Sequence, residues 1–356
     1  MKTKKFKAIA LALLVSFFMI EIARAQDEKT KEYHESFGVS DDTKLLIENK
    51  YGNIDIKDWN QDQVKIDVIV TVKHRNDDKS EKLLGMIDVN ISESGNDIKA
   101  VTNFDDKFGN IGDDTEVSVD YSVQMPADID IEISNKYGDI FISEVTGHAM
   151  VTLKYGNLKA NRIIHGNEKP LSQVNLKYTE AASIEEANWL KVNMKYANLN
   201  IGKLRALVLI SGYSAINVDE ASSIVSEGGY DNYNFGKLDN FVTTIKYSNI
   251  KIEEISEQFN SESNYSDFKI GYMPAGFESV TIDNKYGSYK IGIDESASYK
   301  LAGEASYAKI SYYETGKVSK ILENNSMTVN GTVGTDSNTD SFVKIVTKYG
   351  SVKLDD

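Results

Sequence analysis

The sequence predicts an all-β protein, in the form of a parallel β-solenoid (β-helix) with rungs of about 17–21 residues that follows an N-terminal β-rich cap. Three observations support this prediction. A tyrosine recurs at nearly constant spacing, apolar and polar residues alternate around it, and only three prolines occur in 356 residues. Twenty tyrosines favour strands, and a hydrophobic content of 41% is enough to build a core.

Residues 1–25 are expected to be a signal peptide. Four lysines within the first seven residues precede an apolar run over residues 8–20, and Ala23-Arg24-Ala25 forms a cleavage site. This run is shorter than the about 20 residues that a membrane-spanning helix needs, which favours cleavage over an uncleaved anchor. The protein is therefore expected to be exported and to be periplasmic, outer-surface associated or secreted, with no transmembrane segment after cleavage. Without cysteine, neither a disulfide nor a lipid-modified cysteine is expected.

The acidity of the chain excludes one class of partner. Removal of residues 1–25 takes away five Lys/Arg and one Glu, so the net charge falls from −14 to −18. Binding to nucleic acid needs clustered positive charge, so it is not expected.

The four histidines show no metal-ligand spacing, and neither a nucleophile motif nor a phosphate-binding loop is present. The sequence therefore predicts no catalytic residue, no metal site and no cofactor. The four histidines are His34, His74, His148 and His165.

Residues 26–125 are expected to form the cap, with one short helix over Asp77–Ile87 that begins with acidic residues. A solenoid has open sheet edges at its ends, and a cap would cover the first of them. The strands expected in this segment are Lys44–Ile56, Val64–Val72, Ile87–Ile91, Ile98–Val101 and Glu116–Val123.

Residues 126–356 are expected to form the solenoid repeat domain. From Tyr137 to Tyr307 the gaps between successive anchor tyrosines are 18, 23, 18, 17, 17, 17, 18, 21 and 21 residues. The final gap, to Tyr349, is 42 residues, so one degenerate turn is expected near Met327–Val333. We call the anchor tyrosines the tyrosine ladder; they are Tyr51, Tyr137, Tyr155, Tyr178, Tyr196, Tyr213, Tyr230, Tyr247, Tyr265, Tyr286, Tyr307 and Tyr349.

Alternation around each tyrosine predicts strands with one buried face. The third and fifth residues after the tyrosine are apolar, with Ser183 the only polar residue in these columns, and the residue between them is mostly polar. The tyrosine is an even number of residues from the apolar residues before it, so its side chain should lie on the same face as theirs. We therefore expect it to point toward the core or to lie at a corner. The next residue is Gly, Ala, Ser, Thr or Asp, which indicates a corner that needs small size rather than a left-handed backbone. Every unit repeats the same polarity, which favours parallel stacking over an antiparallel meander.

Two surface features are candidates for binding. A lysine often precedes the ladder tyrosine, and this column of lysines could bind acidic polysaccharide. The favoured interpretation is that the lysines form a solvated strand face that discourages aggregation. The tyrosines could also form a platform for sugar rings, with further members at Tyr233, Tyr289, Tyr299, Tyr312 and Tyr313. A packed ladder whose hydroxyl groups reach the surface is favoured over such a platform. The candidate outward stripe is Lys136, Lys154, Lys177, Lys195, Lys246 and Lys285, and the whole column adds Lys50 and Lys348.

The segment from Val117 to Ile140 contains an alternating strand that ends in Pro126 and a second strand that leads into Gly138-Asp139-Ile140. It resembles the bacterial family of exported "putative adhesins" of unknown function, which is related to the head domains of auto-transporter adhesins. The resemblance implies a β-solenoid in the cell envelope or the medium, and it provides no catalytic residues.

The expected function is therefore a non-catalytic one, in which an extended β surface is presented to protein or glycan partners for adhesion. One alternative is a polysaccharide lyase or hydrolase that uses a groove along the solenoid. Such an enzyme would need clustered acidic residues, whereas the acids here are scattered among the rungs. A second alternative is a structural or signalling protein of the envelope. The identity of the partner is left open.

Overall fold

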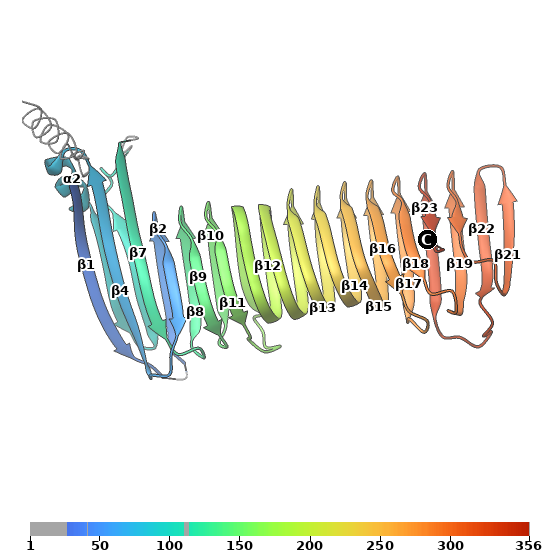
Figure 1. The fold of residues 1–356 in the computed structure, drawn as a ribbon, viewed down its shortest axis with the longest axis horizontal. Helices are drawn as coiled ribbons and strands as arrows, with labels where there is room; N and C mark the ends of the chain where they lie inside the picture. Colours follow the sequence, from blue (N-terminus) through green and yellow to red (C-terminus); the bar gives the residue numbers. More distant parts are fainter. Residues whose placement is uncertain (1–26, 41, 110–113, 356) are drawn as a thin grey trace, which may run out of the picture.

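The computed structural model describes residues 27–40, 42–109 and 114–355. The expected signal peptide, residues 1–25, lies outside this part of the chain. The described chain is mostly β, with a large, mainly parallel mixed sheet and one short helix, and it is elongated along the stacking direction (Figure 1). In the described segments, no helix is long and apolar enough to cross a membrane.

The N-terminal part combines antiparallel and parallel pairing. Strands β1, β4 and β7 pair antiparallel at the left end of Figure 1, β5 pairs antiparallel with β6, and β6 runs parallel to β2. The bounds are β1 Asp27–Gly38, β2 Lys44–Lys50, β3 Ile54–Asp58, β4 Gln63–His74, β5 Ile87–Ser94, β6 Asp97–Phe104 and β7 Thr115–Met125. Strand β1 has no counterpart among the expected strands, because its residues are mostly polar and it pairs along one edge only.

The predicted helix is confirmed as α2, Asp77–Leu84. The Asn76 side chain caps its start by accepting a hydrogen bond from the Lys79 backbone N–H at 3.0 Å. The helix ends at Leu84, three residues earlier than expected, and Gly85 is its C-cap. One strand prediction is wrong: Lys44–Ile56 is two strands, β2 and β3, because the backbone turns sharply at Tyr51 with φ of 66°.

From β8 onward, parallel strands stack in register along the molecule. Each rung supplies one strand before its ladder tyrosine, in what we call the first sheet, and one after it, in the second sheet. Val151 in the first sheet lies between Ile133 and Val174 of the neighbouring rungs. The bounds are β8 Asp130–Lys136, β9 Ile140–Val145, β10 Ala149–Lys154, β11 Leu158–Ile163, β12 Ser172–Gly212, β13 Ala215–Gly229, β14 Asn232–Lys246, β15 Asn249–Asn264, β16 Asp267–Met273, β17 Ser279–Lys285, β18 Tyr289–Ile293 and β19 Tyr299–Ser306.

The two sheets face each other across a continuous apolar core. Phe235 of the second sheet meets Phe241 of the first edge-on, with ring centroids 5.5 Å apart. The expected inward columns are buried on the other rungs except at Tyr312, which is half-buried, and the assignment at Tyr178 is wrong by one residue. Ala182 and Ile184 are buried there and pair with Leu158 and Ala160. Ser183 therefore points outward, because the turn after Tyr178 holds one extra residue.

The order of rungs at the C-terminal end differs from the order of the chain. The expected degenerate turn at Met327–Val333 is wrong: these residues lie in β22 (Ser326–Val333), which pairs antiparallel with β19 and with β21 (Lys317–Glu323). The last long strand, β23 (Phe342–Lys348), returns to lie parallel between β17 and β19 (Figure 1). The short strand β24 (Val352–Lys353) likewise lies between β18 and β20 (Ile310–Ser311). The gap of 42 residues is thus a hairpin and a returning strand.

Candidate functional site: the Lys–Tyr edge

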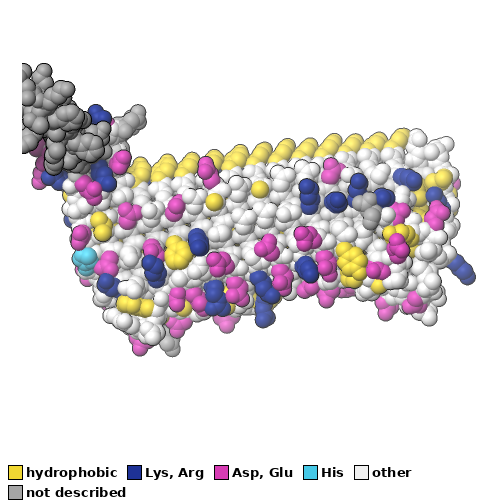
Figure 2. All heavy atoms as spheres, viewed as in Figure 1, with side chains coloured by type: hydrophobic (Ala, Val, Ile, Leu, Met, Phe, Trp, Pro, Cys, Tyr) yellow, Lys and Arg dark blue, Asp and Glu magenta, His cyan; other side chains and the backbone are white. Residues whose placement is uncertain are grey.

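The tyrosine ladder is a single row of stacked rings along one edge of the molecule, seen as the yellow row in Figure 2. Eleven successive ring pairs have centroids 4.7–5.4 Å apart and planes inclined by 2–24°. The row follows spatial order, so Tyr349 stacks between Tyr286 and Tyr307.

Every ladder tyrosine has a left-handed backbone, with φ between 51° and 66°. The expectation of small size without a left-handed backbone holds for the residue after the tyrosine, except at Gly52 with φ of 149°, whereas the tyrosine itself is the left-handed residue of the corner, which was not expected. A left-handed backbone costs a bulky residue about 1–2 kcal/mol, and each stacked pair returns about 0.5–1.5 kcal/mol. The following residue is small because rungs meet closely there: a Cβ added to Gly138 would lie 1.9 Å from the Gly52 carbonyl oxygen.

The ladder presents ring edges and hydroxyl groups rather than ring faces. Eleven of its tyrosines are 39–59% exposed, while their faces lie against neighbouring rings. The edge of an aromatic ring carries the positive part of its quadrupole. A flat platform for sugar rings is therefore not formed along the row. The proposed extra members Tyr233, Tyr289 and Tyr299 are buried in the core instead, where burial raises the pKa of each phenol.

The structure brings five lysines of the column onto consecutive rungs of the first sheet. Lys50 pairs with Lys136, Lys136 with Lys154, and Lys154 with Lys177. Lys195 comes next, since Tyr196 stacks on Tyr178 at 5.2 Å. The ammonium groups of Lys50, Lys136, Lys177 and Lys195 lie 4.4–5.9 Å from the centroids of ladder rings.

The remaining lysines of the column are separated from these five. Gly212 and Gly229 occupy the next two rungs before Lys246. Lys285 and Lys348 lie on adjacent rungs only because β23 returns beside β17. The sequence-predicted stripe is therefore one continuous run followed by shorter pieces.

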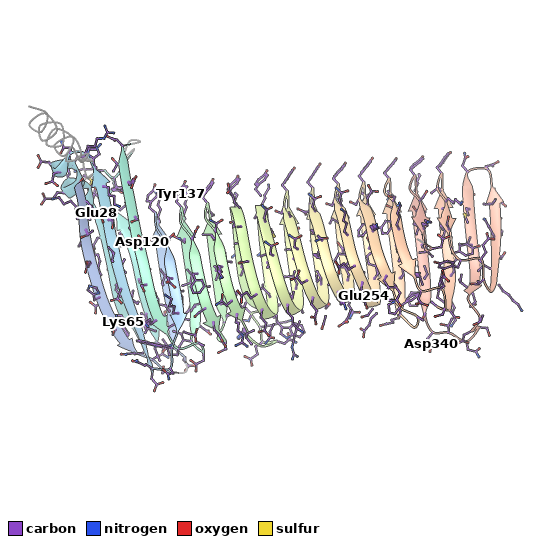
Figure 3. All side chains as sticks on the ribbon, viewed as in Figure 1. Glu28, Lys65, Asp120, Tyr137, Glu254 and Asp340 are labelled. Carbon is purple, nitrogen blue, oxygen red and sulfur yellow. The ribbon has the colours of Figure 1, made fainter. Side chains whose placement is uncertain are left out.

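The five consecutive lysines have no ion-pair partner among the residues that the structure describes. The ion pairs found among the described residues use other lysines, such as Lys44 with Glu132 and Lys203 with Glu220 at 2.9 Å. Two positions before the lysine, the outward residues on four of these rungs are the neutral Ser134, Thr152, Asn175 and Asn193. Figure 3 shows Tyr137 pointing out from one end of the strands and Glu254 near the opposite end. The positive column thus lies at the edge where the ladder runs.

A shallow groove of about 520 Å³ lies beside the ladder on the outer face of the first sheet. Among its lining residues are Lys154, Lys177, Lys195, Asn175, Asn193, Ile210 and Tyr213. Its amides form a hydrogen-bonded row: Asn193 Nδ2 donates to Asn175 Oδ1 at 2.9 Å, and Asn175 Nδ2 donates to Thr152 Oγ1 at 3.2 Å. Sequence reasoning missed this row, although Thr or Asn recurs three residues before the tyrosine. We call the five lysines, the tyrosines that follow them and this groove the Lys–Tyr edge.

Within the described residues, no group of three or more His, Cys, Asp or Glu side chains is arranged to hold a metal ion. The histidines occupy separate places: His148 and His165 meet edge-on at 5.6 Å, His34 bonds Asp67 at 2.7 Å, and the buried His74 bonds Asp114 at 2.9 Å. None of them lies on the Lys–Tyr edge.

No family model and no curated protein matches the chain. Solved structures do match. A "putative cell adhesion protein" from Clostridium sporogenes is 11% identical, with 92% of this chain and 99% of that chain covered and a TM-score of 0.19. A "putative adhesin" from Bacteroides fragilis is 13% identical, with coverage of 67% and 97% and a TM-score of 0.34. A "putative adhesin" from Parabacteroides distasonis is 9% identical, with coverage of 91% and 97% and a TM-score of 0.30. At these TM-scores the likenesses do not bear on function.

Proposed function

We propose that this chain is an exported, non-catalytic β-solenoid that binds a linear acidic polysaccharide along the Lys–Tyr edge. In this proposal residues 1–25 direct export, residues 26–125 cap the stack and residues 126–356 form the repeat domain, to which β2 and β3 add the rung of Tyr51. The observation that supports binding is the run of five register-aligned lysines without ion-pair partners in the described chain.

Stacking like charges on neighbouring strands destabilises a sheet, and neighbouring strands lie only about 4.8 Å apart. A polyanion with regularly spaced carboxylates relieves this repulsion on several rungs at once. Each contact is a charge-assisted hydrogen bond, which is about twice as strong as a neutral one.

The neutral part of the edge suits a sugar polymer. Asn175 and Asn193 offer amide groups for hydroxyls, Ile210 offers an exposed apolar surface for ring C–H groups, and ladder hydroxyls and ring edges add donors along the same line. Single-stranded nucleic acid is the less suitable polyanion, because the faces of the ladder rings lie against one another and leave no ring face along the row on which a base could stack.

The test is a titration with polygalacturonate at low ionic strength, with its neutral methyl ester as the control ligand. The triple variant Lys154→Gln, Lys177→Gln, Lys195→Gln is expected to bind at least about ten-fold more weakly and to show a smaller dependence on salt. A matched control removes the same charge from Lys251, Lys269 and Lys290, which also stack on successive rungs but in the second sheet. The control variant is expected to bind within about three-fold of the parent protein.

Two results would count against the proposal. Equal losses in both triple variants would mean that overall charge, and not the Lys–Tyr edge, determines binding. Release of shortened polymer chains during incubation would favour the alternative of a lyase or hydrolase. An enzyme of that kind uses paired carboxylates, whereas the groove beside the ladder is lined by lysines, amides and apolar residues.

A further inference from the structure

The two ends of the tyrosine ladder differ. At the N-terminal end, the ring of Tyr51 meets the edge of Phe104 with centroids 5.6 Å apart, and Phe108 packs behind Phe104 at 4.8 Å. At the C-terminal end, Tyr307 stacks on Tyr349 at 5.1 Å, and no ring of the described chain covers its other face. Tyr307 is 59% exposed, the largest fraction in the ladder.

The ladder ends at Tyr307 because the next corner holds an asparagine. Asn324 has φ of 50° and is the only residue other than glycine and the ladder tyrosines with a left-handed backbone in the described chain. It lies in the turn between β21 and β22, and the Tyr307 backbone N–H donates to the neighbouring Asn325 carbonyl at 2.7 Å. The corner of the stack is therefore continued, but with a short amide side chain where the other corners have a ring.

A pocket of about 420 Å³ lies between Tyr307 and this hairpin turn. It is lined by Lys309, Lys320, Leu322, Asn324 and Asn325 as well as Tyr307. Its volume falls within the range of small-molecule sites, about 300–1,000 Å³. On the other side of the turn, Glu323 and Ser306 line a neighbouring hollow that also reaches Tyr307.

From these residues we infer that the C-terminal tip of the ladder is a separate site for a single pyranose ring that bears a carboxylate. The free face of Tyr307 and the Leu322 side chain can cover the C–H face of the sugar, as aromatic rings do for apolar surfaces. Lys309 and Lys320 line the same pocket, so their ammonium groups can pair with its carboxylate. The amides of Asn324 and Asn325 and the Glu323 carboxylate can bond its hydroxyls.

Along the row, neighbouring rings cover the faces of the tyrosines, whereas at the C-terminal end one face of Tyr307 is open to a sugar ring. The tip shares no residue with the Lys–Tyr edge, so it can be tested whether or not the edge binds a polymer. A short ligand distinguishes the two, because one or two sugar units span too few rungs to engage the run of lysines.

The test titrates digalacturonate into the full chain, with neutral cellobiose as the control ligand, and follows saturation transfer to the sugar C–H protons by NMR. Digalacturonate is expected to bind saturably, and Tyr307→Leu to weaken it at least about ten-fold. Tyr307→Phe keeps the ring face and is expected to bind within about three-fold of the parent. Lys309→Gln with Lys320→Gln, which leaves the stack intact, is expected to lose at least about ten-fold.

The triple substitution at Lys154, Lys177 and Lys195 is expected to leave digalacturonate binding unchanged. If that variant loses digalacturonate while Tyr307→Leu retains it, the short ligand binds at the edge and the tip site is refuted. Absence of saturable binding to the parent protein, or binding of cellobiose as tight as that of digalacturonate, would also overturn the inference. Neither result would affect polygalacturonate binding at the Lys–Tyr edge.

Discussion

The left-handed tyrosines predict an unusual order of stability for substitutions at a ladder corner. Within strands, glycine is about 0.5–1 kcal/mol less favourable than alanine because it loses more backbone entropy on folding. At Tyr230, where φ is 62°, alanine would meet the steric penalty of a left-handed backbone and glycine would not. We expect the order to reverse, with Tyr230→Gly more stable than Tyr230→Ala.

The magnitude follows from the contacts of Tyr230. Both substitutions lose stacking on Tyr213 at 4.8 Å and on Tyr247 at 4.9 Å, together about 1–3 kcal/mol. They also lose the buried half of a side chain that is 51% exposed, so alanine should cost about 3–5 kcal/mol in total. Relief of about 1–2 kcal/mol of steric strain, less the entropy term, makes glycine better than alanine by about 0.5–1 kcal/mol.

Urea unfolding followed by far-UV circular dichroism measures this difference as a shift in midpoint at equal slope. Thr244 is the control, because it is an exposed position within β14 without a left-handed backbone. At Thr244 the alanine variant should be the more stable one. A Tyr230→Gly variant no more stable than Tyr230→Ala would refute the argument that backbone strain is built into the ladder.

Three further outcomes are expected. The carboxyl of Asp231 is buried, and burial raises its pKa, so its charged form destabilises the folded protein at a pH above the ordinary carboxyl pKa. Asp231→Asn should therefore raise the urea midpoint at pH 7. This gain should vanish as the pH falls below the pKa of an ordinary carboxyl group, where the carboxyl is protonated in both the folded and the unfolded protein. Gly350→Ala should destabilise by about 1–3 kcal/mol, because its Cβ would lie 1.9 Å from the Gly287 carbonyl oxygen, whereas Gly166→Ala, with open space around it, should change thermal stability by less than about 0.5 kcal/mol. Lys154→Gln should stabilise the free protein by about 0.2–1 kcal/mol at low salt, and a gain that persists in 1 M salt would contradict like-charge repulsion in the lysine column.

The repeat was predictable because its signals are local. Alternation of apolar and polar residues identifies the buried face of each strand without knowledge of its neighbour. It predicts the inward columns correctly except after Tyr178 and at Tyr312, which is half-buried. There, one extra residue in the turn shifts Ala182 and Ile184 inward. One extra residue exchanges the inward and outward positions of the strand that follows. It changes the spacing between tyrosines by only one residue, which cannot be distinguished among gaps of 17–23 residues.

The candidate site was predictable only in part. The lysine column can be found from its place before each tyrosine, but its division into a run of five and shorter pieces depends on which strands are neighbours. Lys285 and Lys348 are 63 residues apart and meet through β23. The uncovered face of Tyr307 depends on a hairpin whose direction the alternation does not reveal, because a strand has the same two faces whichever way it runs.

Rung length, the inward and outward columns and the corner positions are thus encoded in short stretches of residues, because the two-residue period of a strand and the small size needed where rungs meet act over a few neighbours. Three features came only from folding the whole chain: the left-handed tyrosines, the return of β23 between β17 and β19, and the antiparallel hairpin at the tip. They are set by stacking and hydrogen bonding between residues far apart in the chain, and these contacts exist only once the rungs lie against one another.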